Sequence, residues 1–187
     1  MRQNVKTRLR RVTETGVLLA LLIVLQAATR SAGQYVTGTC VNAVLALAVL
    51  AAGLWSGAAV AVLSPFFAFL LGIGPQLLPI VPAIAVGNAV FAVLLWALAG
   101  RGNPPLGRRV LAWPAAAAGK FLTLYLLVVR LLCALLPLQP QQTALFTAMF
   151  SWPQLVTALA GGGLALLAAP PLRRALKRGR RGTAGDL

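Results

Sequence analysis

Apolar residues form six long stretches along the chain, separated by short polar or proline-containing segments. A helix needs about 20 residues to cross the ~30 Å hydrocarbon core of a bilayer. The second and third stretches are short, but together they are too long for one span, and Trp55, Ser56 and Gly57 can form a tight turn between them. The pattern therefore predicts an all-α membrane protein with six transmembrane helices. The predicted spans are 15–29 (extendable backwards through Val12), 39–54, 57–73, 80–99, 110–136 and 142–168.

The segments between these spans divide the chain into one membrane domain and two basic ends. Polar loops are expected at 30–38 and 101–109, and Pro170 and Pro171 are expected to end the last helix. A hydrophobic content of 59% and a mean hydropathy of +0.86 agree with a multi-span membrane protein. The predicted parts are a basic N-terminus at 1–14, a single six-helix domain at 15–169 and a basic tail at 170–187.

Positive charge is concentrated in three places. The chain has 17 Lys and Arg residues against two acids, a net charge of +15. Fourteen of the 17 lie in the two ends and in the 101–109 loop, which six spans would place on the same side of the membrane. The positive-inside rule then predicts that both termini are cytoplasmic. This distribution, together with the lack of an RNA- or DNA-binding motif, argues against nucleic acid as a partner.

The sequence lacks the residue types that most catalytic sites require. It contains no histidine, and its two acids, Glu14 and Asp186, lie outside the spans. General acid–base catalysis, a Ser-His-Asp arrangement and hard-metal ligation therefore lack their usual groups, and no phosphate-binding loop occurs. We expect neither an enzyme nor a resident metal or cofactor. A self-sufficient ion-driven carrier would also need intramembrane acids, so the energy for uphill transport should come from another subunit.

Two cations interrupt the fifth span. Lys120 and Arg130 lie on one side of the predicted helix, and the helical rise places Arg130 nearer the outer surface. In one interpretation, each side chain reaches the nearer membrane surface and buries only its stem. In the other, Arg130 has no intramembrane acid to pair with, faces a cavity open to the outside and binds a carboxylate or phosphate. Lys120, nearer the cytoplasm, is the second candidate for this contact.

Polar residues also follow one face of the sixth span. At about 100° per residue, five of them fall on a single stripe. Such a stripe indicates either a cavity or a helix–helix interface held together by hydroxyl groups. Pro153 should free the backbone carbonyl near Met149 and bend the helix there. The stripe consists of Thr143, Thr147, Ser151, Gln154 and Thr157, flanked by Phe146, Phe150 and Trp152.

Other polar residues are weaker candidates for the same cavity. Asn42 and Asn88 lie in the outer halves of the second and fourth spans, where a buried amide needs a partner. Tyr35 belongs to the loop after the first span and could cover a pocket. Each residue taken alone is also compatible with a purely structural role.

Small residues mark two places of close helix approach. Gly161, Gly162 and Gly163 lie inside an apolar run, which indicates tight helix packing rather than phosphate binding. Gly16 and Ala20 form a small-xxx-small pair in the first span. Their spacing fits an internal neighbour and an external partner helix equally well.

With these features, the chain resembles the substrate-binding S components of energy-coupling factor (ECF) transporters, which are bacterial vitamin-uptake systems. The similarity covers essentially the whole chain in length, number of spans, basic N-terminus and the early small-xxx-small pair. In that family an Ala-xxx-Ala pair docks on the transmembrane coupling subunit, and Gly16 and Ala20 occupy the matching positions. The loop that covers the substrate would correspond to 34–38, and the runs 36–42 and 149–154 are similar to those of S components with unassigned substrates.

The resemblance implies a binding subunit without ATPase activity. Such a subunit takes its ligand from outside the cell and topples in the membrane when it is docked to the coupling subunit and two ABC ATPases. This arrangement would supply the energy source that the chain lacks. Neither the acidic residues associated with thiamine recognition nor a histidine-rich N-terminus is present, so the sequence leaves the substrate open.

The leading hypothesis is a substrate-specific subunit of an ECF-type importer in the bacterial cell membrane, which captures a small anionic vitamin or related micronutrient. The alternative is a non-transporting membrane assembly protein whose polar stripes are helix–helix interfaces. Gly16 and Ala20 would dock the partner in the first case. The predicted ligand-binding residues are Arg130, Gln154, Ser151, Thr147, Asn88, Trp152, Phe150, Tyr35, Asn42 and Lys120.

Overall fold

A computed structural model describes residues 2–100 and 105–185, and within these ranges the chain is helical, without strands. Five helices are long and apolar enough to cross a membrane, and a shorter apolar helix spans Leu54–Leu70. The prediction of an all-α protein with six membrane-length or near-membrane-length helical segments is thus confirmed. The helices are α1 (Arg2–Thr29), α2 (Gln34–Leu47), α3 (Leu54–Leu70), α4 (Ile80–Ala99), α5 (Leu106–Leu124), α6 (Cys133–Leu135), α7 (Pro140–Met149) and α8 (Trp152–Gly185). The 3-10 helix η1 (Arg30–Ala32) and the π-helical segments η2 (Ala48–Ala52) and η3 (Tyr125–Leu132) join them.

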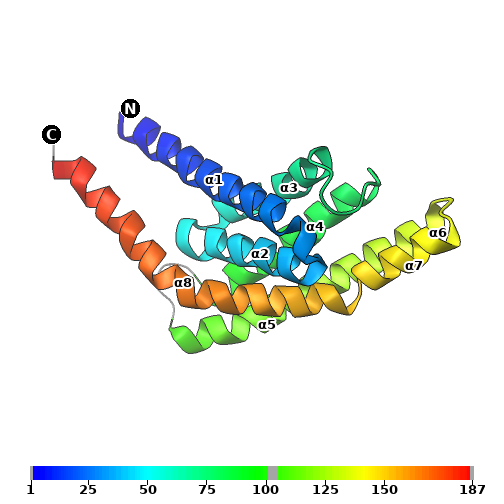
Figure 1. Cartoon of the computed structure of the whole chain (residues 1–187). Coiled ribbons are helices and arrows are strands. Elements are labelled where there is room, and N and C mark those ends of the chain that lie inside the picture. The colour runs from blue at the N-terminus through cyan, green and yellow to red at the C-terminus, as the bar shows by residue number, and fades with distance from the viewer. Residues whose placement is uncertain (1, 101–104, 186–187) are drawn as a thin grey trace.

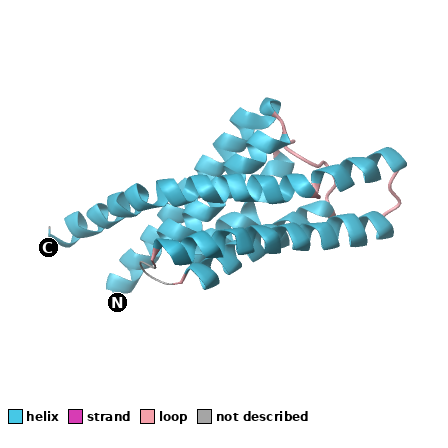
Figure 2. Cartoon of the chain, turned by 90° about the horizontal axis from the view of Figure 1, so that it is seen from below, coloured by secondary structure: helices cyan, strands magenta, loops and turns pink. Residues whose placement is uncertain are grey.

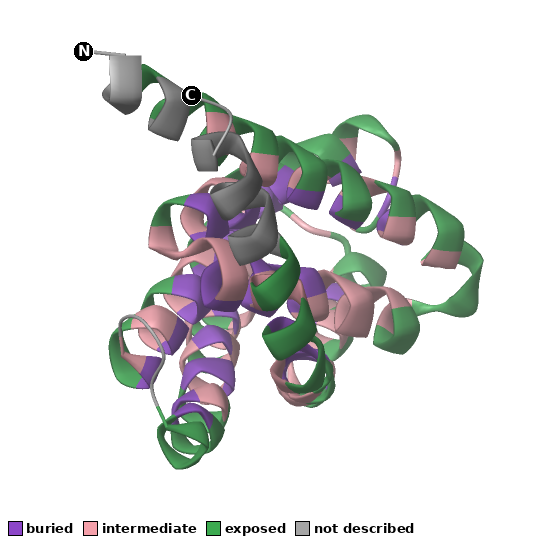
Figure 3. Ribbon diagram, turned by 90° about the vertical axis from the view of Figure 1, so that its left-hand side faces the viewer, coloured by how far each residue is buried: buried purple, intermediate pink, exposed green. Residues whose placement is uncertain are grey.

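The helices form one bundle around α2, α4 and α8. The α8 helix packs along α2 and α5, α4 lies between α3 and α5, and α1 covers α2 and α3 (Figure 1). The start of α1 and the end of α8 lie at one end of the bundle, whereas the hairpin formed by η3, α6 and α7 extends at the other end (Figure 2). Buried residues lie along the inner faces of the helices, and α3 and α4 carry many of them (Figure 3).

Close contact between α2 and α8 depends on glycine. A Cβ atom at Gly161 would lie 2.5 Å from the carbonyl oxygen of Thr39 and 2.6 Å from the backbone nitrogen of Ala43. At Gly162 it would lie 2.3 Å from Cδ1 of Trp113. The interpretation of the three glycines as a packing motif is therefore confirmed for Gly161 and Gly162.

Two predicted connections are shorter than expected because glycines make the turns. Gly53, with φ of 100°, connects η2 to α3, so Trp55, Ser56 and Gly57 lie in the first turn of α3 rather than in a turn between helices. Likewise Gly33, with φ of 85°, separates η1 from α2, and most of the predicted 30–38 loop is helical. Glycine adopts these positive φ values without the steric cost of a Cβ atom.

The end of the last helix was predicted wrongly. The α8 helix continues through Pro170 and Pro171 to Gly185. A proline removes a backbone donor but has a φ angle compatible with a helix, so it weakens or bends a helix without always ending it. Beyond the two prolines, Arg173 Nε donates to the carbonyl of Leu50 and ties this part of α8 to the bundle. Of the predicted basic loop at 101–109, residues 101–104 lie outside the described residues, and Leu106 already begins α5.

Candidate functional site

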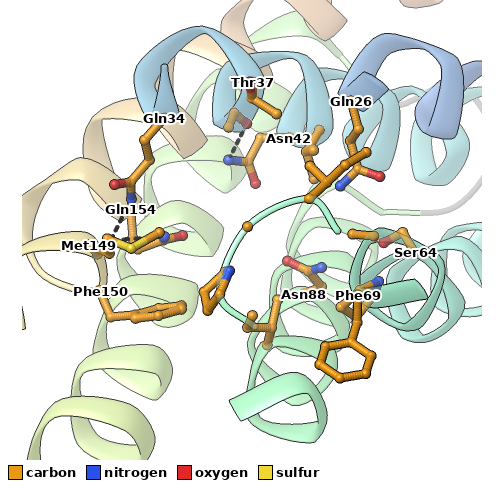
Figure 4. A pocket seen from close by; sticks show the side chains of 18 of the residues that line it. Gln26, Gln34, Thr37, Asn42, Ser64, Phe69, Asn88, Met149, Phe150 and Gln154 are labelled. Carbon is orange, nitrogen blue, oxygen red and sulfur yellow. Dashed lines mark hydrogen bonds between the residues drawn. The ribbon is translucent and has the colours of Figure 1, made fainter. Parts of the chain in front are cut away.

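A cavity of about 250 Å³ lies between the helices in the half of the bundle distant from the start of α1 (Figure 4). Its lining comes from α1, η1, α2, α3, the turn around Gly74, α4, α5 and the junction of α7 with α8. Much of this lining is apolar. The polar lining residues are Gln26, Arg30, Gln34, Thr37, Asn42, Ser64, Asn88, Lys120 and Gln154.

Lys120 is the buried cation of this cavity. Its side chain is only 3% exposed, its Nζ donates to Asn42 Oδ1 at 2.6 Å, and Nζ lies 5.9 Å from the centre of the Phe91 ring. The described residues that line the cavity include no Asp or Glu. A buried ammonium group is costly unless an anion or several hydrogen bonds compensate for its lost hydration. The site therefore favours a ligand group that is anionic or a strong hydrogen-bond acceptor.

Asn42 connects Lys120 to two other helices. Because an ammonium group only donates, the contact with Lys120 identifies the Asn42 atom as its amide oxygen. The amide nitrogen of Asn42 then donates to the Gly38 carbonyl at 2.9 Å and to Thr157 Oγ1 at 3.2 Å. Thr157 is 2% exposed and donates to the Gln154 carbonyl at 3.3 Å. This network fixes α2, α5 and α8 relative to one another at the cavity.

The predicted sixth span is interrupted beside the cavity, where α7 ends at Met149 and α8 begins at Trp152. Pro153 has no N–H to bond to the carbonyl four residues earlier, that of Met149. This carbonyl instead accepts hydrogen bonds from Gln34 Nε2 at 2.6 Å and Gln154 Nε2 at 3.1 Å (Figure 4). The prediction that Pro153 frees this carbonyl is confirmed, and the bend expected there is a complete break.

A second proline acts in the same way inside α3. Pro65 cannot donate to the carbonyl of Ala61, four residues earlier. Asn88 of α4 occupies this position, and its Nδ2 donates to the Ala61 oxygen at 3.4 Å. Asn88 is 2% exposed and lines the cavity. The sequence contains the proline, but nothing in it identifies the helix that supplies the amide.

Half of the ten predicted ligand residues line the cavity. Asn42, Asn88, Lys120, Phe150 and Gln154 are brought together there. The Phe150 ring and the Gln154 amide face the cavity from the side opposite to Asn88 (Figure 4).

The other five predicted ligand residues are not part of the cavity lining. Arg130 is exposed on η3, and Trp152 is 68% exposed and stacks on Phe121 with 5.7 Å between ring centres. Tyr35 is 57% exposed. Ser151 Oγ donates to the backbone carbonyl of Thr147, so the Ser151 hydroxyl already has a partner in the preceding turn. The single stripe expected from Thr143 to Thr157 requires an uninterrupted helix, and the break at 150–151 separates its two halves.

The relative position of the two cations also differs from the expectation. Arg130 was the first candidate for a contact in the cavity and Lys120, nearer the cytoplasm, the second, but Lys120 lines the cavity and Arg130 does not. Helical rise gave the depth of both residues, whereas the cavity position depends on how α5 packs against α2 and α4. Ligand binding by either residue stays a prediction.

Sequence reasoning missed three polar lining residues. Gln26 and Ser64 are isolated polar residues inside apolar runs, and each is at least 93% buried. Such residues are a detectable signal for a cavity or a buried partner. Arg30, the basic residue between the first two predicted spans, is exposed and lies at the cavity edge.

The proposed docking pair on α1 is accessible. Gly16 and Ala20 are both exposed, and no heavy atom lies within 4 Å of a Cβ atom built on Gly16. Residues four apart share one face of a helix. An internal packing role for this pair is therefore not supported within the described residues.

Replacing Gln34 with alanine should loosen the junction of α7 and α8. The carbonyl of Met149 would lose its 2.6 Å partner and keep only Gln154, at a cost of about 1 kcal/mol. We expect backbone amides near this junction to exchange with deuterium about fivefold faster. Tyr35→Ala, at the exposed neighbouring position, is the control, and equal exchange in both variants would contradict the assigned role of Gln34.

A comparison with protein families finds one match that covers most of the chain. A family described as "ECF transporter, substrate-specific component" matches residues 10–173. Neither the curated proteins nor the solved structures include a significant match to the sequence.

Proposed function

The chain belongs to the family of substrate-specific components of ECF transporters, and on this premise we propose that it captures a small anionic vitamin or related micronutrient outside a bacterial cell. We further propose that it docks on a transmembrane coupling subunit and two ABC ATPases, which drive uptake. The family consists of substrate-binding transporter subunits rather than enzymes.

Buried Lys120 is the observation that carries the ligand part of this proposal. A cation that is 3% exposed, beside an otherwise largely apolar cavity, is suited to an acidic molecule with an apolar body. Asn42 orients its ammonium group. Arg30 adds an exposed positive charge at the cavity edge, where it would attract an anion before binding.

The position of the cavity supports capture from outside. The cavity lies near the C-terminal end of α1, where Gln26 and Arg30 line it, and thus away from the chain ends. If the basic ends are cytoplasmic, as the distribution of Lys and Arg predicts, the cavity lies in the outer half of the bundle. Access from that side is what an importer's binding subunit requires.

The exposed Gly16 and Ala20 support the partner part of the proposal. Small residues on an exposed helix face allow another membrane helix to approach its backbone closely. This pair lies on an exposed face near the middle of α1, whereas Gln26 is buried on another face of the same helix. Docking there would leave the cavity residues free to hold a ligand.

The Gly16→Leu, Ala20→Leu double variant should separate binding from transport. Leucine side chains would keep a partner helix away, so we expect uptake in cells and co-purification of ATPases to fall at least tenfold, while binding by the purified protein is unchanged. Ala28→Leu, at an exposed site on another face of α1, is the control. We expect it to leave uptake and the co-purification of ATPases unchanged. A purified wild type without saturable ligand binding, and a pull-down without ATPases, would instead support the assembly-protein alternative.

A further inference from the structure

Three buried oxygen atoms of the cavity lining lack a hydrogen-bond partner in the part of the chain that the structure describes. They are Gln26 Oε1, Ser64 Oγ and Asn88 Oδ1, and the three residues are 7%, 1% and 2% exposed. They come from α1, α3 and α4 and lie on one side of the cavity (Figure 4). Because more than nine in ten buried polar groups in proteins are paired, such a cluster indicates that a bound molecule supplies the missing donors.

The orientation of the Asn88 amide determines which kind of group a bound molecule must offer to it. The Ala61 carbonyl, left without its helical donor by Pro65, can only accept a hydrogen bond. It therefore faces the amide nitrogen of Asn88, at 3.4 Å. The amide oxygen is left as the unpaired atom. An amide oxygen accepts but does not donate, so its partner must carry an N–H or O–H group.

Ser64 differs from several other hydroxyl residues of the bundle. Thr13, Thr15, Thr29 and Thr123 each donate to the carbonyl four residues earlier in their own helix. This bond is the usual way for a hydroxyl to be satisfied in a membrane helix. Ser64 Oγ makes no such bond with the described residues. Its hydroxyl is therefore available to a molecule in the cavity.

Lys120 lies close to this acceptor cluster. Its Nζ lies 5.9 Å from the ring centre of Phe91, which follows Asn88 by about one helical turn on α4. The cavity thus combines the Lys120 ammonium group, which only donates hydrogen bonds, with Asn88 Oδ1, which only accepts them. A bare carboxylate would satisfy Lys120 but would place a further acceptor near Asn88 Oδ1.

Resting on the proposed function, we propose that the ligand presents an N–H or O–H donor to Asn88 Oδ1 and a hydrogen-bonding group to the Ser64 hydroxyl, together with a carboxylate or carbonyl oxygen to Lys120. The cavity then selects a donor-bearing acid or amide and disfavours a carboxylate of similar shape that has no donor. A site built around hydrogen bonds rejects the analogue without the matching group because its own buried atoms stay unpaired.

Matched small molecules test this selectivity on the purified full-length protein by calorimetry. The pairs are biotin with lipoate and pantothenate with octanoate, where both members carry a carboxylate and only the first has N–H or O–H donors in addition to it. In the pair that binds, we expect the donor-bearing member to bind at least tenfold more tightly. Equal or tighter binding of the donor-free member would overturn the donor requirement alone, whereas no binding by any of the four would count against the proposed function itself.

The Ser64→Ala variant distinguishes a ligand contact from a purely structural role of Ser64, because melting temperature and ligand affinity should respond differently. Removing an unpaired buried hydroxyl should leave the melting temperature of the unliganded protein unchanged or higher. Affinity for the donor-bearing probe should fall about tenfold. Ser151→Ala, whose hydroxyl is satisfied by Thr147 outside the cavity, is the matched control and should retain affinity. Unchanged affinity of Ser64→Ala would remove Ser64 from the proposal.

Discussion

Replacing Lys120 with methionine should weaken ligand binding by at least about 30-fold while the protein stays folded. Methionine keeps an unbranched apolar stem in place of the lysine stem. The variant loses the charge that faces the ligand and leaves Asn42 Oδ1 without the donor that lies 2.6 Å away. Removing one partner of a buried, charged hydrogen-bonded pair costs about 2–5 kcal/mol, and each 1.4 kcal/mol is a factor of ten in affinity. Calorimetric titration of the purified variant measures the loss.

Arg130→Met is the matched control for this prediction. It removes the same charge from the same helical segment, but Arg130 is exposed and outside the cavity lining. We expect wild-type affinity from this variant. A loss of binding in Arg130→Met with none in Lys120→Met would restore the assignment made from the sequence and would place the ligand outside this cavity.

The two cations illustrate what sequence reasoning reached and where it stopped. Hydropathy predicted the helices, and the lack of intramembrane acids made both Lys120 and Arg130 notable. The choice between them depends on the rotation of α5 against its neighbours, which sets the inward-facing side chains. Lys120 meets Asn42, 78 positions away in the chain. No local pattern contains that pairing.

Prolines gave the most useful local signal of the site. Pro153 identified Met149 as a free carbonyl from the sequence alone, and the same rule applied to Pro65 would have identified Ala61. In both places a side-chain amide of the cavity lining donates to the freed oxygen. The prolines thereby orient the amides of Gln34 and Asn88. The helices that supply these amides could be identified only from the packing.

The broken sixth span explains why the polar stripe is not continuous. Angular counting at a constant rotation per residue is valid only while the helix continues. Phe150 and Ser151 leave the helical path, so residues before and after them face different neighbours. Thr157 consequently joins the Lys120 network through Asn42, and the Gln154 carbonyl joins it by accepting from Thr157, whereas Thr143 and Thr147 stay on α7. One proline thus divides a regular pattern into a half beside the cavity and a half outside it.

Substituting Gly161 with alanine should destabilise the protein and weaken ligand binding together. The added Cβ would lie 2.5 Å from the Thr39 carbonyl and 2.6 Å from the Ala43 nitrogen, backbone atoms that can move only if α2 separates from α8. Overpacking of this kind costs about 1–3 kcal/mol, against the small gain in helix propensity that alanine brings. A lower melting temperature in detergent measures the first effect.

Gly163→Ala separates this clash from a general response of α8 to substitution. A Cβ atom at Gly163 would meet Trp113 only at 3.4 Å, an ordinary van der Waals contact, so this variant should melt within a few degrees of wild type. Since α2 carries Asn42 between Lys120 and Thr157, a displaced α2 in Gly161→Ala should also lower affinity at temperatures where the protein is folded. If both variants melt alike, close contact between α2 and α8 is not what positions Asn42, and the Lys120 network must be held by α2 and α5 alone.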